Sequence, residues 1–170
     1  NLEIKNFDPK IINTELELLK KVGAKIKTNN NTIFIKGPNK LRSVKNIKTK
    51  EFPGIPTDLQ AQLMVLMCRS VGNSSITESI FENRFMHVAE LQRLGAKINI
   101  KNNKAFIEGN TKFIGAELMS SDLRASVALV LAALVANGKS IVGRVYHLER
   151  GYENIVSKLK KIGVKIKRLK

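Results

Sequence analysis

The stretch that decides the fold is Leu91-Gln92-Arg93-Leu94-Gly95-Ala96-Lys97-Ile98, because the chain carries this pattern three times. An earlier copy reads Leu18-Leu19-Lys20-Lys21-Val22-Gly23-Ala24-Lys25-Ile26, and a later one reads Leu159-Lys160-Lys161-Ile162-Gly163-Val164-Lys165-Ile166. The three glycines lie 72 and 68 residues apart. Each glycine ends a helical pattern and precedes an alternating one, so each copy predicts a helix, a left-handed glycine cap and a strand.

The elements around each copy repeat as well. Polar hairpins follow the first two glycines, and short strand patterns precede all three outer helices, at residues 2–4, 75–77 and 140–142. Two further helices, Asp58 to Val71 and Asp122 to Ala136, are rich in Ala, Leu, Val and Met on all sides. Helices that are apolar all round are usually buried.

One unit therefore reads strand, buried helix, strand, outer helix, strand, strand. We interpret residues 1–170 as a single, partial α/β (α+β) domain with pseudo-threefold βαβαββ repeats at 1–38, 46–109 and 115–170. The first unit lacks its opening strand and buried helix, and the last lacks its closing strand. A period near seventy residues is too long for a solenoid, so a compact domain with buried helices inside is expected.

Composition restricts the class of protein. A hydrophobic content of 43% supports a core, and the 5% aromatic content offers little for stacking on bases. The net charge of +16 sits largely in Lys/Asn-rich stretches that resemble hairpins and exposed helix faces, which favours solvated surface over a nucleic-acid footprint. A basic nucleic-acid-binding module stays the non-enzyme alternative, and its binding would weaken steeply with salt.

The cysteine and terminal residues set further expectations. The single Cys68 excludes an internal disulfide and a cysteine-rich zinc site, and a reducing, cytoplasmic setting is the default. The longest apolar run, Val127 to Ala136, is too short to span a membrane. Because the sequence opens on Asn1 with no signal-peptide pattern, we expect an excised or processed fragment.

Charged residues recur where strands meet helices. Asp58 ends the turn Glu51-Phe52-Pro53-Gly54-Ile55-Pro56-Thr57, and Asp122 and Arg124 open the second apolar helix. Arg84 and Arg150 lie in Phe81-Glu82-Asn83-Arg84-Phe85 and Leu148-Glu149-Arg150-Gly151-Tyr152. Such junctions often hold phosphate or carboxylate ligands. The plainer alternatives are helix caps for the aspartates and surface ion pairs with Glu82 and Glu149 for the two loop arginines.

Arg124, one turn into an apolar helix, needs either a partner carboxylate such as Asp122 or a ligand anion. Cys68 falls inside the other apolar helix and is expected to be a buried, inert thiol. His87 and His147 have no acidic or thiol companions at ligand spacing, so no metal site is expected.

Four ordered segments carry a resemblance to a known family. They read Phe52-Pro53-Gly54-Ile55-Pro56-Thr57-Asp58-Leu59-Gln60-Ala61-Gln62, Ile80-Phe81-Glu82-Asn83-Arg84-Phe85-Met86-His87, Asp122-Leu123-Arg124-Ala125-Ser126 and Tyr146-His147-Leu148-Glu149-Arg150-Gly151-Tyr152-Glu153. The chain resembles the C-terminal domain of the UDP-N-acetylglucosamine 1-carboxyvinyltransferases, enolpyruvyl transferases that open bacterial peptidoglycan synthesis. The resemblance implies an inside-out α/β barrel domain and a second, N-terminal catalytic domain as partner.

It also implies a reaction and roles. The enolpyruvyl group of phosphoenolpyruvate would pass to the 3-hydroxyl of UDP-N-acetylglucosamine with release of phosphate, through a tetrahedral intermediate. By resemblance Asp58 contacts the sugar hydroxyl as candidate base, the backbone at Ile80 helps hold the UDP-sugar, and Asp122 is a second acid near the reacting centre. The arginines that would face phosphoenolpyruvate across the interdomain cleft are Arg84, Arg124 and Arg150.

The resemblance implies no cofactor, no metal, and neither a nucleic-acid nor a membrane partner. The family's loop cysteine and its lysine near the chain start lie in the other domain, so this chain alone is expected to be inactive. The nearest enzyme alternative is an enolpyruvylshikimate-phosphate synthase-like domain, which shares the fold and phosphoenolpyruvate.

Overall fold

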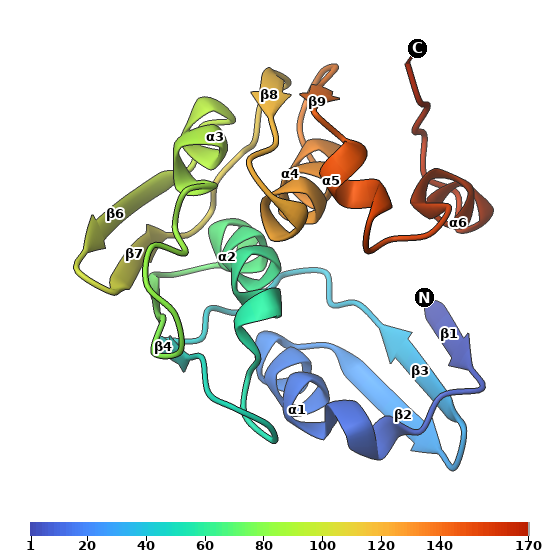
Figure 1. Cartoon of the computed structure of the whole chain (residues 1–170). Coiled ribbons are helices and arrows are strands. Elements are labelled where there is room, and N and C mark those ends of the chain that lie inside the picture. The colour runs from blue at the N-terminus through green and yellow to red at the C-terminus, as the bar shows by residue number, and fades with distance from the viewer. Residues whose placement is uncertain (170) are drawn as a thin grey trace.

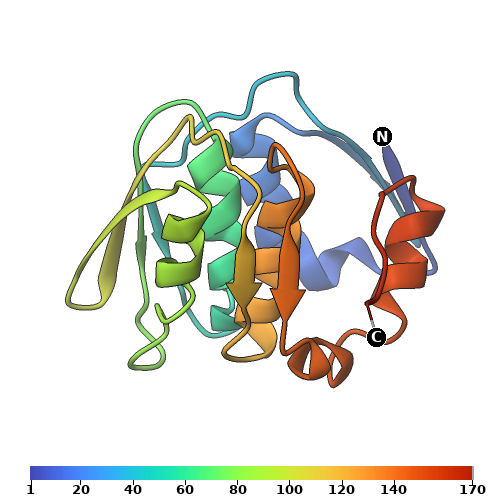
Figure 2. The ribbon, with the colours of Figure 1, turned by 90° about the horizontal axis from the view of Figure 1, so that it is seen from above.

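Two apolar helices form the centre of the computed structural model, which describes residues 1–169. They are α2 (Gln60–Arg69) and α4 (Leu123–Leu134), and they lie side by side in both views (Figures 1 and 2). Met64 and Met67 on α2, and Ala128 and Leu129 on α4, are fully buried. The prediction of two buried helices is therefore confirmed, with the first preceded by a 3-10 turn, η2 (Thr57–Leu59).

Three small sheets surround these helices. The first is antiparallel, in the order β1-β3-β2, and consists of β1 (Leu2–Lys5), β2 (Lys25–Asn29) and β3 (Thr32–Lys36). The second has the order β4-β5-β7-β6, from β4 (Asn46–Lys48), β5 (Ser74–Thr77), β6 (Lys97–Lys101) and β7 (Lys104–Glu108). The third pairs β8 (Glu117–Met119) with β9 (Ile141–Gly143) in parallel, as β4 pairs with β5.

The outer helices end in the same way in all three units. They are α1 (Asn13–Val22), α3 (Val88–Arg93) and α6 (Ile155–Lys161), while η1 (Pro9–Ile12) and α5 (Tyr146–Glu149) are short additions. Gly23, Gly95 and Gly163 take φ of 112°, 98° and 90°. The amide after each glycine donates to a helix carbonyl five residues back, as Ala96 does to Leu91 at 3.0 Å. The predicted glycine caps are confirmed.

One expected strand is absent. The alternating residues after Gly163 lie in no strand within residues 164–169. After Gly23 and Gly95 the strand forms because a returning strand pairs with it, β2 with β3 and β6 with β7. No returning strand follows Gly163 among the described residues, so the backbone there has no ladder to join. The prediction of a third strand was therefore wrong.

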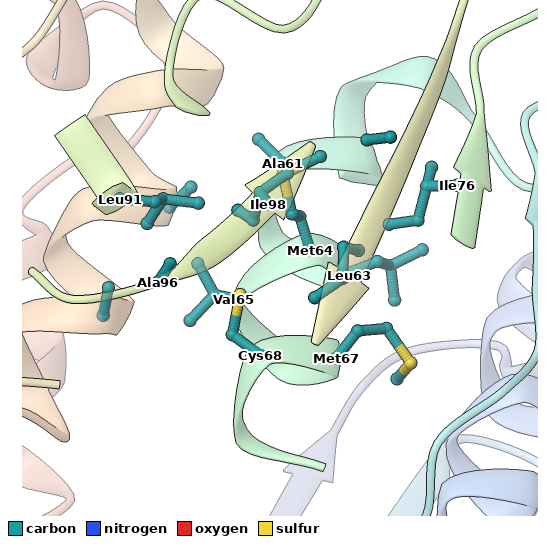
Figure 3. Packing of buried hydrophobic residues seen from close by; sticks show 14 of the residues in the cluster. Ala61, Leu63, Met64, Val65, Met67, Cys68, Ile76, Leu91, Ala96 and Ile98 are labelled. Atoms are coloured by element: carbon teal, nitrogen blue, oxygen red, sulfur yellow. The ribbon is translucent and has the colours of Figure 1, made fainter. Parts of the chain in front are cut away.

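The core joins the units into one body. Figure 3 shows Met64, Val65 and Cys68 of α2 packed among residues of the neighbouring elements, including Leu91 of α3 and Ile98 of β6. A smaller cluster around Val127, Val130 and Leu148 attaches α5 and α6 to α4. Within the part of the chain that the structure describes, no helix is both long and apolar enough to cross a membrane.

Candidate active site

Asp58 stands at the entrance to α2, with its side chain 73% exposed. Pro56 is extended ahead of it (φ −70°, ψ 147°), and a hydrogen bond from the Lys50 amide to the Ile55 carbonyl at 2.8 Å closes the preceding loop. The Asp58 carboxylate makes no capping bond to either helix. The cap interpretation therefore does not account for this residue.

Asp122 is the N-cap of α4. Its Oδ1 accepts hydrogen bonds from the amides of Arg124 at 2.9 Å and Ala125 at 3.2 Å. Burial by itself would raise the pKa of Asp122, but these amides, the Ser121 hydroxyl and the Arg124 charge outweigh it and hold the pKa below the usual 3.8. Asp122 is thus an ionised cap at neutral pH, as the plainer interpretation had it, and it can still face a ligand.

Arg124 binds both carboxylates. Its Nε lies 2.7 Å from Asp58 Oδ1, and its Nη1 lies 3.7 Å from Asp122 Oδ1. The partner that the sequence required for this half-buried arginine is therefore supplied by the protein. The planar guanidinium suits such a bridge, because its donors point in fixed and different directions. The bridge links the start of α2 to the start of α4.

A pocket of about 140 Å³ opens beside this bridge. A cavity of about 150 Å³ takes a benzene-sized ligand, so this pocket suits a group of phosphate or carboxylate size rather than a whole sugar nucleotide. Its charged residues are of both signs. The lining residues are Thr57, Gln60, Ala61, Glu82, Asn83, Arg84, Met86, His87, Asp122 and Arg124.

Of the two arginines that line the pocket, Arg124 forms ion pairs and Arg84 forms none with any residue of 1–169. The Arg84 guanidinium lies 4.5 Å from the centre of the Phe81 ring, and the ion pair with Glu82 considered from the sequence does not form. The ring holds the arginine in place while leaving its donors unused by a carboxylate. This arrangement can receive an anion.

Two of the sequence-predicted residues lie outside the pocket lining. The Ile80 amide is engaged by Glu78 at 2.9 Å. Arg150 follows α5 directly and is exposed, and Glu149 pairs with Arg168 instead, at 2.5 Å. Gly151, the neighbour of Arg150, packs against the first residue of α4, since a Cβ on Gly151 would meet the Leu123 side chain at 2.8 Å.

Two buried polar residues line the pocket: Gln60, for which the sequence suggested no role, and His87, which was considered only as a metal ligand. Gln60 and His87 are 2% and 4% exposed, and the Nε2 atom of each has no hydrogen-bond partner among the described residues. Buried polar atoms are rarely left unpaired, so both mark a place where a ligand or another segment belongs. Burial lowers the pKa of His87 to about 4, against the opposing charge of Asp122, so its ring is neutral.

Glu78 is the other missed residue, with its carboxylate buried directly behind the pocket wall. A carboxylate directly after the short predicted strand at residues 75–77 was the signal that could have identified it. Cys68 is buried inside α2, and burial raises the pKa of its thiol to about 12. Residues 1–169 contain no cluster of three His, Cys, Asp or Glu side chains able to hold a metal ion.

The comparison with protein families identifies the class to which this fold and site belong. The family model for EPSP synthase (3-phosphoshikimate 1-carboxyvinyltransferase) matches residues 1–159. The chain belongs to this family.

Curated relatives of this chain share one enzyme name within the family. The UDP-N-acetylglucosamine 1-carboxyvinyltransferase of Pelagibacter ubique is 62% identical over 169 residues, which are 99% of this chain and 40% of the relative. Proteins of the same name from Desulfosudis oleivorans and Helicobacter pylori are 48% and 49% identical over the same shares. The chain thus spans about 40% of the length of these relatives.

Solved structures agree with the fold assignment. The enolpyruvyl transferase NikO from Streptomyces tendae aligns with a TM-score of 0.87 and 28% identity, over 98% of this chain and 39% of that one. An EPSP synthase from Acinetobacter baumannii aligns with a TM-score of 0.72 and 19% identity, over 91% and 39%. At that identity the second likeness shows the fold alone. The predicted enolpyruvyl transferase-like fold is confirmed.

Proposed function

We propose that this chain is one domain of an enzyme that transfers the enolpyruvyl group of phosphoenolpyruvate to the 3-hydroxyl of UDP-N-acetylglucosamine and releases phosphate. The observation that carries the proposal is the 62% identity to an enzyme named for 1-carboxyvinyl transfer to that sugar nucleotide, together with the Asp58–Arg124–Asp122 cluster. The product would serve cell-wall peptidoglycan synthesis, in the cytoplasm.

The acceptor side of the reaction falls to Asp58. Its exposed carboxylate can accept a hydrogen bond from the sugar hydroxyl and take its proton as the oxygen adds to C2 of phosphoenolpyruvate. Arg124 orients this carboxylate through the 2.7 Å contact. The backbone at Ile80 is proposed to hold the UDP-sugar. Its amide already donates to Glu78, so the carbonyl oxygen is the group that would face the ligand.

The donor side needs positive charge around the phosphate and carboxylate of phosphoenolpyruvate. Arg84 offers unpaired donors at the pocket, Arg124 a partly neutralised guanidinium, and Arg150 an exposed one next to the start of α4. Asp122 would lie close to the reacting carbons as the second acid. The proton that adds to the methylene carbon would come from the partner domain, which also closes the cleft.

The test is an assay of the full-length enzyme that contains this chain. Incubated with phosphoenolpyruvate and UDP-N-acetylglucosamine, it should release phosphate and give the sugar nucleotide plus an enolpyruvyl group by mass spectrometry. Shikimate 3-phosphate is the matched acceptor for the EPSP synthase alternative. Product from shikimate 3-phosphate and none from the sugar nucleotide would reverse the assignment.

A further inference from the structure

Glu78 is a carboxylate enclosed by the protein next to the candidate active site. It follows β5 directly, is 2% exposed, and forms no ion pair with any described residue. An ionised carboxylate in such a place is costly unless hydrogen bonds replace its lost water. The groups around Glu78 therefore have to stabilise its charge, and they show what the residue does.

Four donors surround the carboxylate. The hydroxyls of Thr49 and Thr57 each lie 2.8 Å from one of its oxygens, and the amides of Ile80 and Phe81 lie 2.9 and 3.3 Å from Oε1. Burial acts to raise the pKa of Glu78, but these hydrogen bonds outweigh it and hold the pKa below 4.5. Glu78 is consequently ionised at neutral pH, and both of its oxygens accept hydrogen bonds.

Three of the four donors belong to two segments that form the site, and the fourth, Thr49, directly follows β4. Thr57, whose hydroxyl donates to Oε2, directly precedes Asp58 and lines the pocket. Ile80 and Phe81, whose amides donate to Oε1, begin the segment in which Arg84 lies over the Phe81 ring. Because one rigid, planar group receives donors from both segments, it fixes the distance between them.

We propose that Glu78 is a positioning residue, which holds the Asp58 turn and the Ile80–Phe81 backbone as one unit facing the sugar end of the acceptor. This inference rests on the proposed function, in which Asp58 and Ile80 contact the sugar nucleotide. Glu78 itself does not reach the substrate, since its side chain is enclosed and its oxygens are occupied.

Two variants of the full-length enzyme separate positioning from general stability. Thr57→Val removes only the link to the Asp58 turn, so kcat should fall roughly ten- to a hundredfold while the KM for UDP-N-acetylglucosamine changes less than about threefold. Glu78→Asp shortens the side chain and loosens both segments, so kcat should fall and that KM should also rise, by about tenfold. The KM for phosphoenolpyruvate should stay unchanged in Thr57→Val.

The matched control is Thr111→Val. Thr111 is also a buried threonine, 7% exposed, but its hydroxyl donates to the Glu108 carbonyl at 3.5 Å, and its backbone lies at the end of α2 away from the pocket, where its amide donates to the Cys68 carbonyl. This variant should lose thermal stability and keep kcat and both KM values. If Thr57→Val and Glu78→Asp behave like Thr111→Val, with a lower melting temperature and intact kinetics, Glu78 is only structural and the proposal is wrong.

Hydrogen exchange of the same full-length proteins decides the positioning role without relying on activity. In Glu78→Asp, peptides covering residues 55–60 and 79–84 should exchange faster together, and neither should change in Thr111→Val. Faster exchange in one segment alone would overturn the rigid-unit idea. Failure of the wild-type enzyme to use the sugar nucleotide would instead remove the proposed function and leave this measurement valid.

Discussion

Arg124 reaches Asp58 across 66 residues of sequence, with Nε 2.7 Å from Oδ1. The contact joins the starts of the two central helices, and it places the exposed carboxylate of one unit under the control of a half-buried arginine of the next. An ion pair so exposed on one side contributes little to stability. Its value lies in where it holds the Asp58 oxygen atoms.

The first prediction concerns Asp58→Asn in the full-length enzyme. The amide keeps the size and can still accept a hydrogen bond from Arg124, but it cannot take a proton from the sugar hydroxyl. We expect kcat to fall at least about a hundredfold, with the KM for UDP-N-acetylglucosamine changing less than about fivefold. Steady-state kinetics with both substrates measure this. Near-normal turnover would remove the base assignment.

Arg124→Lys should show whether the pair acts as a unit. A lysine ammonium can contact one carboxylate but cannot bridge Asp58 and Asp122, so kcat should fall about tenfold. In a double-mutant cycle with Asp58→Asn the losses should overlap, with a coupling of about 1–3 kcal/mol. The exposed pair Lys97–Glu108, 3.4 Å apart, is the control and should show additive, negligible effects. Additive losses for Arg124 and Asp58 would mean independent roles.

The glycine caps could be predicted from the sequence, because each depends on a few neighbouring residues. Their spacing was enough to predict the repeated units. The strand expected after Gly163 failed because a strand also depends on a partner elsewhere. The contact between Asp58 and Arg124 likewise depends on two segments that are distant in the sequence. Both residues could be nominated from their junctions, but their pairing needs the packing of α2 on α4.

Glu78 and His87 mark the same limit. The sequence indicates only that Glu78 follows a predicted strand and that His87 lies in a selected segment, and neither pattern shows that the residue is buried or which groups surround it. Only the fold brings the hydroxyls of Thr49 and Thr57 to Glu78. Arg150 stays a prediction from the resemblance, because the pocket lining does not include it.

His87 makes stability depend on pH. Its pKa is about 4 in the folded protein, because of burial, against 6.5 for an ordinary histidine. The unfolded chain therefore binds more protons between these values, so stability is complete above about pH 6.5 and declines as pH falls towards 4. Between pH 7.5 and 5 the loss should be about 2 kcal/mol.

The matched variant is His87→Gln, measured by denaturant unfolding of the full-length enzyme at several pH values. Between pH 5 and 6.5, above the ordinary pKa values of Glu78 (4.5) and Asp122 (3.8), its stability should decline less than that of the wild type. Parallel curves for the two proteins in that range would show that His87 is not held neutral by burial.

Arg150→Lys tests the arginine that lies outside the pocket. Gly151 packs on Leu123 at the start of α4, so the backbone of Arg150 lies near the helix that carries Asp122 and Arg124 at its start. The proposed function places an anion within reach of the Arg150 side chain. A point charge cannot reproduce a bidentate fork, so the KM for phosphoenolpyruvate should rise about tenfold with little change for the sugar nucleotide. Exposed Arg93 on α3 is a suitable control as Arg93→Lys. An unchanged KM for phosphoenolpyruvate would show that Arg150 is an ordinary surface residue with no role in binding this substrate.

The last prediction concerns the chain by itself. Its pocket of about 140 Å³ cannot enclose a sugar nucleotide, and Asp58 lies open to solvent. Enolpyruvyl transfer needs a closed site that excludes water and a proton donor for the methylene carbon, and we expect the partner domain to supply both. Purified residues 1–170 should therefore release no phosphate from phosphoenolpyruvate and UDP-N-acetylglucosamine above a no-protein control, whereas the full-length enzyme should. Phosphate release by the chain alone that disappears in Asp58→Asn would show that these residues suffice for the chemistry.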